Sequence, residues 1–367
     1  MVVPMDVASR ADRLRATMDE AGCDALCVTR LVNVRYLTGF TGSSAVLVVL
    51  PGELVLVTDG RYREQAAAEL AAAGVVARVE TAMTQEAQGQ LLAAAAAGCA
   101  RVGLEAEAVT WAQQQRYRDR WLAGCELVAT TGLVEGLRLV KDAGEVARME
   151  AAAAAADGAL AAVGPRLALG PTEAELALDL ESEMRARGAA GPGFDTIVAA
   201  GPNASRPHHR PTDRPIGPGE LVIVDFGAVV DGYRSDMTRT LCVGEPTAEA
   251  RRMVEVVAES QRAGVAAVCH GAGAADVDAA CRAVIEEAGM GEAFLHGTGH
   301  GVGLEVHEAP RLALAATGTL VEGSVVTVEP GVYLPGHGGA RIEDMVLVTK
   351  QGCRALTNAP KELVVSP

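Results

Sequence analysis

The feature that most constrains the fold is a nine-residue segment that recurs after 104 residues. Residues 219–227 (GELVIVDFG) align with residues 323–331 (GSVVTVEPG), and both copies begin and end with glycine and share two valines. An acid stands at the same place in each copy, Asp225 in the first and Glu329 in the second. Two related halves that face each other would bring both acids to one central site, so the sequence predicts an internal duplication.

The elements predicted around the two copies repeat in the order αα, ββ, αα, ββ. The pattern of apolar residues predicts helices over 143–163, 172–188, 248–268 and 276–288, and strands over 220–228, 233–241, 324–329 and 341–349. A capping box from Thr172 to Glu175 opens the second helix, and Asp276, 104 residues after Thr172, is predicted to cap the fourth. Residues 133–367 are therefore expected to form one α+β domain.

The residues before this domain have a different pattern. Apolar strand-like runs alternate with helical ones. Strands are predicted at 24–29, 45–50, 54–58, 75–79 and 126–129, and helices at 9–21 and 62–72. This alternation predicts a smaller α/β domain over residues 1–132. A chain of 367 residues is long enough for two such domains.

Charge and composition exclude several classes of function. The net charge of −15 argues against nonspecific binding to nucleic acid and to anionic membranes, because both need basic surfaces. No apolar stretch approaches the roughly 18–20 residues of a membrane span, and the N-terminus lacks the apolar core of a secretory signal. The eight cysteines are scattered without a CxxC pair, which indicates free thiols. We therefore expect a cytoplasmic protein.

Acids in the predicted strands point to a metal site. Asp225 interrupts an apolar strand, where a carboxylate is costly unless it is paired or bound to a metal. The Asp231-Gly232 pair predicts a hairpin turn that places Asp225 opposite Thr238, with Asp236 on the same face. Such diagonal neighbours lie roughly 7–8 Å apart, so their carboxylates could share cations.

The second half adds further candidate ligands. Glu329 ends one predicted strand, and Glu343 shares a strand face with Arg341. Four acids would repel one another unless cations were bound between them. Five of the seven histidines fall in two stretches, which contain His208, His209, His296, His300 and His307. One imidazole with four carboxylates suits Mn²⁺ or Co²⁺, with Zn²⁺ as an alternative.

These motifs resemble those of the pita-bread metallopeptidases, in the group of the Xaa-Pro aminopeptidases and prolidases (Xaa-Pro dipeptidases). The resemblance covers nearly the whole chain. It rests on YLTGFTGS from Tyr36, TDGRY from Thr58, LRLVK from Leu137, VDFG from Val224, SDMTR from Ser235, GHGVGLEVHE from Gly299, VEPG from Val328 and RIED from Arg341. It implies a pita-bread catalytic domain with an internal αα-ββ duplication, preceded by a creatinase-like N-terminal domain.

The resemblance also implies roles for particular residues. The family's five metal ligands fall on Asp225, Asp236, His300, Glu329 and Glu343. Asp236 and Glu343 would bridge two divalent metal ions, Asp225 would bind one of them, and His300 and Glu329 would bind the other. Glu329 would also act as general base, while His208 and His307 would bind substrate and stabilise the tetrahedral intermediate. His296 would line the proline side of the cleft, Arg341 would orient ligands, and His209 is expected to be structural.

The leading hypothesis is a dinuclear exopeptidase that cleaves the Xaa-Pro bond at the N-terminus of short proline-containing peptides, as an Xaa-Pro aminopeptidase does. The alternative within the family is an Xaa-Pro dipeptidase, which the sequence does not distinguish from it. A methionine aminopeptidase fits less well because of the extra N-terminal domain, and creatinase works without this metal set. A catalytically inactive peptide-binding module should have lost ligands, and none is missing. The resemblance further implies a homodimer.

Overall fold

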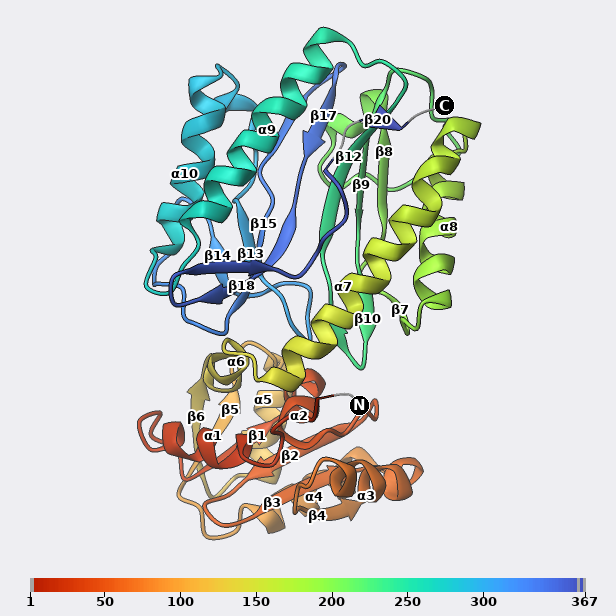
Figure 1. Ribbon diagram of the computed structural model, residues 1–367. Coiled ribbons are helices and arrows are strands. Elements are labelled where there is room, and N and C mark those ends of the chain that lie inside the picture. The colour runs from red at the N-terminus through yellow and green to blue at the C-terminus, as the bar shows by residue number, and fades with distance from the viewer. Residues whose placement is uncertain (1–2, 362–363, 366–367) are drawn as a thin grey trace. The chain divides into compact units, whose positions relative to one another are not determined.

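The computed structural model describes residues 3–361 and 364–365, which form two compact units (Figure 1). Pro4–Arg138 make up the N-terminal unit, and the chain from Leu139 onward makes up the C-terminal unit. The division falls six residues after the predicted boundary at 132/133, because helix α6 (Leu133–Arg138) packs on the N-terminal unit. Its Arg138 guanidinium donates to Asn33 Oδ1 at 2.7 Å.

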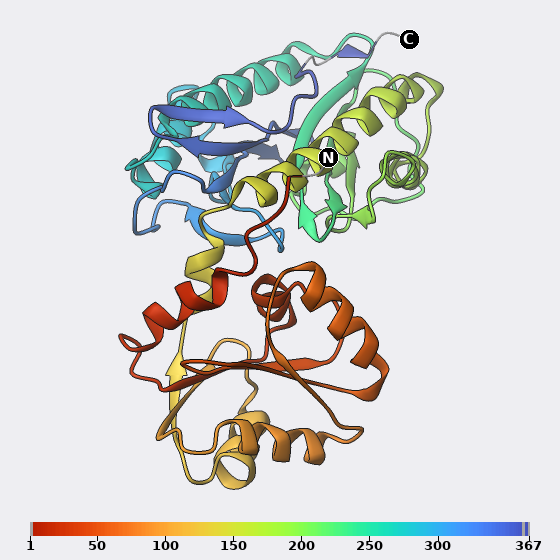
Figure 2. The same cartoon turned by 60° about the horizontal axis from the view of Figure 1, so that its bottom comes forward.

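The N-terminal unit is a mixed six-stranded sheet in the order β4-β3-β2-β1-β5-β6, with helices on both faces (Figure 2). Its strands are β1 (Ala25–Val28), β2 (Ala45–Val49), β3 (Leu54–Thr58), β4 (Arg78–Thr81), β5 (Arg101–Glu105) and β6 (Glu126–Thr130). Its other helices are α1 (Arg10–Met18), α2 (Leu31–Thr38), α3 (Arg63–Ala72), α4 (Gln85–Ala95) and α5 (Trp111–Arg116). The strand expected at 75–79 begins three residues later, since pairing with β3 starts only at Arg78.

The C-terminal unit contains two helix pairs with sheets between them (Figure 1). The helices are α7 (Ala143–Val163), α8 (Glu173–Ala186), α9 (Ala248–Ala267) and α10 (Ala274–Glu287). One four-stranded sheet contains β8 (Ile197–Ala200), β9 (Leu221–Phe226), β12 (Met237–Val243) and β20 (Val364–Val365). One five-stranded sheet contains β13 (Gly299–Gly301), β14 (Glu308–Leu312), β15 (Val325–Val328), β18 (Asp344–Thr349) and β19 (Gly352–Ala355). The smaller strands are β7 (Gly191–Pro192), β10 (Ala228–Val230), β11 (Tyr233–Arg234), β16 (Gly331–Leu334) and β17 (Gly338–Arg341).

The predicted duplication is present in this unit. Strand β9, flanked by β8 and β12, repeats as β15, flanked by β13 and β18. Each half has its own apolar core, one beneath α7 and α8 and the other beneath α9 and α10. Gly219 and Gly323, which open the repeated segment, both have a positive φ, 77° and 89°. The turn before the central strand of each half therefore requires glycine at the same place.

The start of the fourth helix is not where the sequence predicted it. The Thr172 capping box is present at the start of α8, but the N-cap of α10 is Gly273 rather than Asp276. Asp276 lies in the first turn instead, where a carboxylate interacts favourably with the helix dipole. The N-cap residues of the two helices, Thr172 and Gly273, each form an isolated β-bridge, and in this respect the two helix starts correspond.

The predicted hairpin register is confirmed. Asp231 and Gly232 both have positive φ, 48° and 82°, as a two-residue turn between twisted strands requires. Asp225 therefore pairs with Thr238, and Asp236 lies just before β12. Among the described residues, no helix is both long and apolar enough to cross a bilayer.

Candidate metal centre and active site

The five predicted ligands converge on one cleft of about 480 Å³ in the C-terminal unit. Asp225 comes from the end of β9, Asp236 from the residue before β12 and His300 from β13. Glu329 directly follows β15, and Glu343 lies between β17 and β18. Both halves of the duplication therefore contribute acids to the same wall, as the repeated segment indicated.

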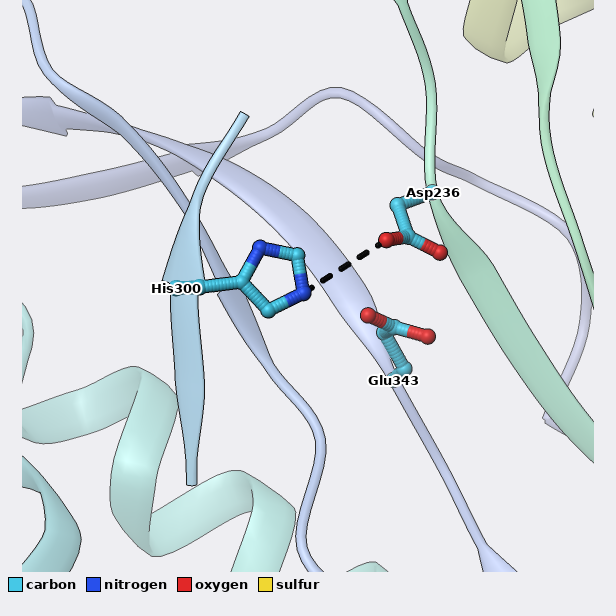
Figure 3. Close-up of side chains that lie close together, drawn as sticks. All are labelled: Asp236, His300 and Glu343. Atoms are coloured by element: carbon cyan, nitrogen blue, oxygen red, sulfur yellow. Dashed lines mark ion pairs between the residues drawn. The ribbon is translucent and has the colours of Figure 1, made fainter. Parts of the chain in front are cut away.

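Three of these side chains form the centre of the cluster. Asp236, His300 and Glu343 each place one ligand atom within 4.8 Å of the other two. Figure 3 shows them extending toward a common point from three separate segments of the chain. His300 Nε2 lies 3.6 Å from Asp236 Oδ2 and 3.3 Å from Glu329 Oε1. The geometry leaves room for a cation between a nitrogen and several oxygens.

The orientation of His300 suits metal binding through Nε2. Its Nδ1 lies 2.9 Å from the carbonyl oxygen of Gly301, which can only accept a hydrogen bond. Nδ1 therefore carries a proton, and Nε2 faces the carboxylates, where loss of its own proton would free a lone pair for a metal ion. The backbone nitrogen of His300 donates to Thr327 Oγ1, and that hydroxyl in turn donates to Glu329 Oε1 at 3.3 Å. One threonine thus positions two candidate ligands.

Asp225 occupies a different environment. Its Oδ2 accepts a hydrogen bond of 2.6 Å from the buried guanidinium of Arg341. Its Oδ1 is buried and has no hydrogen-bond partner among the described residues. A buried carboxylate oxygen without a partner is costly, and a cation in the cleft would supply one. This observation fits a metal ion bound beside Asp225.

The protonation of the cluster supports the same interpretation. Burial and the neighbouring negative charges, above all Glu343, hold the pKa of Asp236 well above its usual range. Burial and the charges of Glu329 and Asp225 do the same to the pKa of Glu343. Burial would also raise the pKa of Glu329, but its hydrogen bond and attraction to His300 outweigh burial and lower this pKa to about 2. Divalent cations would relieve the repulsion, and oxygen-rich donors suit hard metal ions.

A buried acid supports the loop that carries His296 and His300. Asp278 in α10 is fully buried, and its Oδ1 accepts hydrogen bonds of 2.9 Å from both the backbone nitrogen and the hydroxyl of Thr298. Thr298 then accepts, through its carbonyl oxygen, a hydrogen bond of 2.7 Å from the backbone nitrogen of Glu329. Asp278 therefore fixes the backbone between the two histidines and the strand end of Glu329.

The other predicted histidines also line the cleft. The rings of His300 and His307 meet edge to face with centroids 4.3 Å apart. Burial, together with the charge of His300, lowers the pKa of His307, which favours its neutral form. His208 is exposed in the cleft and makes no hydrogen bond to any described residue. Its neighbour His209 is buried instead and lies 2.9 Å from Glu173.

Tyr333 was not singled out by sequence reasoning. Its hydroxyl accepts a hydrogen bond of 2.7 Å from Arg341 and lies 2.8 Å from His296 Nε2. Because His296 Nδ1 faces the carbonyl oxygen of Gly297, Nε2 accepts from Tyr333. Burial raises the pKa of Tyr333 to about 12, so this hydroxyl keeps its proton. No motif marked this tyrosine, because its partners are contributed only by the fold.

Arg311 was also missed. It lies on β14 directly opposite His300 and lines the cleft. It is exposed, and no acid in the described part of the chain pairs with it. The only signal in the sequence was a basic residue four positions after His307. Arg311 thus supplies a positive charge to the cleft beside a candidate metal ligand.

Comparisons with known proteins agree with this arrangement. Residues 147–350 match metallopeptidase family M24, and residues 10–140 match the creatinase/prolidase N-terminal domain. An Xaa-Pro dipeptidase of Pyrococcus furiosus is 33% identical over 97% of this chain and 99% of its own length. The structure of an Xaa-Pro dipeptidase from Bacillus anthracis is 37% identical, with a TM-score of 0.91 over 97% of this chain and 99% of that one.

An X-Pro aminopeptidase from Thermotoga maritima is similar as well. Its structure is 31% identical to this chain and has a TM-score of 0.87 over 96% of this chain and 100% of that one. Both kinds of exopeptidase therefore share the fold described here. The resemblance inferred from the sequence motifs is confirmed, together with the fold class.

Proposed function

The chain belongs to metallopeptidase family M24, and on that premise we propose that it is an Xaa-Pro dipeptidase that hydrolyses dipeptides with a C-terminal proline. A metal-dependent peptidase acting on Xaa-Pro bonds is the activity that the family and the relatives support. The finer choice is between a dipeptidase and the aminopeptidase that the sequence analysis favoured. It depends on how the cleft receives the residue after the scissile bond.

Arg311 is the observation that carries the choice of a dipeptidase. In a dipeptide, the free carboxylate belongs to the residue directly after the scissile bond. The Cα atom of that residue lies about 3.8 Å from the Cα atom of the residue before it. Arg311 stands across a strand pair from His300, and directly opposite residues have Cβ atoms about 4.5–5.5 Å apart. Arg311 also lines the cleft, so its guanidinium is available to bind that carboxylate, and a carboxylate is the group that arginine pairs with best.

We assign the metal site to two divalent cations, with Mn²⁺ as the first candidate. Asp236 and Glu343 would bridge them, Asp225 would bind one, and His300 and Glu329 would bind the other. When bound, such cations would polarise the scissile carbonyl and lower the pKa of a water molecule. The orphaned Oδ1 of Asp225 and the raised pKa values of Asp236 and Glu343 support this assignment.

The remaining residues in the cleft would bind and orient the substrate. Glu329 is the proposed general base, and it would take the proton of the attacking water. His208 and His307 would donate hydrogen bonds to the oxygen of the scissile carbonyl as negative charge develops there. The pair of His296 and Tyr333 would line the proline side, while Arg341 orients Asp225.

A peptide panel on metal-stripped enzyme with Mn²⁺ added back tests the proposal. It would compare Ala-Pro, Ala-Pro amide, Ala-Pro-Ala, Ala-Ala and Met-Ala-Ser. We expect Ala-Pro to be cleaved best, and Arg311→Leu to raise KM for Ala-Pro about tenfold or more with little change for the amide. Faster release of alanine from Ala-Pro-Ala, with no effect of the substitution, would establish the aminopeptidase instead.

Other outcomes address the remaining hypotheses. No cleavage of any peptide by protein that holds its metals would favour the peptide-binding module. Preference for Met-Ala-Ser would indicate a methionine aminopeptidase. The expected homodimer, the cytoplasmic location and the identity of the metal stay predictions.

A further inference from the structure

A fully buried glutamate stands behind the loop that carries His208. Glu173 is the first residue of α8, and its side chain is completely shielded from solvent. It accepts hydrogen bonds from residues on both sides of the loop 201–212, namely from Ala200 N at 2.8 Å, Asn203 Nδ2 at 3.0 Å, His209 Nε2 at 2.9 Å, Thr212 N at 3.1 Å and Thr212 Oγ1 at 2.6 Å. One carboxylate therefore fastens the loop at its beginning, its middle and its end.

The environment of Glu173 keeps it ionised. Burial would raise its pKa, but the hydrogen bonds from the Thr212 hydroxyl, the Ala200 nitrogen and their neighbours outweigh burial and lower it. A position at the N-terminus of a helix also favours a negative charge. The Thr172 capping box already satisfies the start of α8, so the helix itself does not require this acid. Its hydrogen-bond capacity is directed to the loop.

The loop places its two adjacent histidines in opposite environments. His209 is buried against Glu173, whereas His208 is exposed in the cleft together with Arg210. His208 has no hydrogen bond of its own to any described residue, so the position of its imidazole depends strongly on the backbone on either side. That backbone is held by Glu173 through His209 and Thr212.

We propose that Glu173 is a positioning residue for His208, acting through His209, Asn203 and Thr212 to hold the imidazole at the scissile carbonyl. The proposal rests on the function proposed above, because it takes His208 to be in contact with the substrate. A misplacement of about 1 Å in a group of this kind can lower the rate by up to about 100-fold. A loop held at several points by one ion would prevent such a displacement.

A double-mutant cycle tests the proposal. We would measure kcat and KM for the wild type, Glu173→Gln, His208→Ala and the double variant, all loaded with Mn²⁺, using the peptide that the wild type cleaves fastest. Glutamine keeps the shape of the side chain but replaces one acceptor oxygen by a donor. Glu173→Gln should lower kcat about tenfold or more at unchanged metal content.

The double variant gives the decisive comparison. If Glu173 acts only through His208, the double variant will be no slower than His208→Ala within about twofold, because residues that act as a unit are not additive. Multiplied losses, or a wild-type kcat in Glu173→Gln, would overturn the proposal. Metal loss in Glu173→Gln would also overturn it, since the acid would then act on the metal site.

A matched control separates positioning from stability. Glu105 is likewise buried, and it accepts hydrogen bonds from the Thr29 nitrogen and hydroxyl, the Arg30 nitrogen and Asn33 Nδ2 in the N-terminal unit. Glu105→Gln should lose a similar amount of stability, but its kcat should stay within twofold of the wild type. An equal loss of kcat in Glu105→Gln would show a general effect of destabilisation and would refute the positioning role.

Two further measurements cover the case in which Glu173→Gln folds poorly. Thr212→Val removes one donor to Glu173 with little change in volume, and it should lower kcat in the same direction by a smaller factor. Hydrogen exchange should rise over residues 200–212 in both variants, and this readout needs no substrate. Unchanged exchange there would overturn the proposal, whereas failure of the wild type to cleave Xaa-Pro peptides would count against the proposed function alone.

Discussion

The buried Asp278 allows the support of the candidate metal site to be tested quantitatively. Asp278→Ala would leave the Thr298 nitrogen and hydroxyl without their acceptor in the interior. Each buried donor left unsatisfied costs about 1–3 kcal/mol. Arg282 also pairs with Asp278, but it is partly exposed, so the loss of this ion pair adds only about 0–1 kcal/mol. The expected loss is therefore about 2–7 kcal/mol in the free energy of unfolding.

The same substitution should weaken metal binding. Thr298 accepts the hydrogen bond from the backbone of Glu329, so releasing Thr298 loosens a proposed ligand without removing it. Loss of an outer partner of this kind typically costs about 10–100-fold in metal affinity. Urea unfolding of the metal-free protein and Mn²⁺ titration by calorimetry would measure the two effects separately.

Asp276 provides the control on the same helix. It is exposed in the first turn of α10, so Asp276→Ala should cost at most about 1 kcal/mol, the size of a helix-dipole interaction. Its affinity for Mn²⁺ should equal that of the wild type. If Asp278→Ala is as mild as Asp276→Ala in both assays, the reasoning about Thr298 is refuted.

Three further predictions concern the site itself. Asp236→Ala should abolish turnover and lower the metal content, because a proposed bridging ligand is lost; a near-wild-type rate at full metal content would contradict the two-metal assignment. His307→Ala should retain its metals and mainly lower kcat, by about 100-fold if it stabilises the oxyanion, whereas loss of metal would show that its role is misassigned. The pKa of Glu173 is lowered below its ordinary value of 4.5, so its stabilising effect should be complete above that pH and fade as the pH falls through the folded-state pKa. The difference in unfolding free energy between the wild type and Glu173→Gln should therefore shrink on acidification in urea titrations, and a constant difference would contradict this.

Much of the fold could be predicted because its signals are local. Helix α7 spans the predicted residues 143–163, and the predicted capping box at Thr172 opens α8. The turn at Asp231-Gly232 set the hairpin register by its length and chirality. The start of α10 was predicted wrongly because Asp276 is a residue type that commonly caps helices. The N-cap is instead Gly273, which forms an isolated β-bridge and has no side chain to mark it as a cap.

The proposed ligands could be named from motifs, and the fold brings all five of them to one cleft. Their supporting residues could not be named in this way. Glu173 lies 36 residues from His209, and Tyr333 lies 37 from His296. These contacts depend on how strands and loops from different parts of the chain pack, and no local pattern encodes such packing. Arg311 lies beside His300 only because β14 pairs with β13.

The sequence by itself predicted most of the helices and strands, the repeat within the C-terminal unit and the candidate ligands, since periodicity, turn residues and motifs are properties of neighbouring residues. Only the tertiary structure decided which of these side chains are buried, which are linked by hydrogen bonds and which buried acids hold them in place. The physical reason is that desolvation, charge interaction and hydrogen bonding depend on distance in space. At Asp225 and Arg341, 116 residues apart, that distance is 2.6 Å.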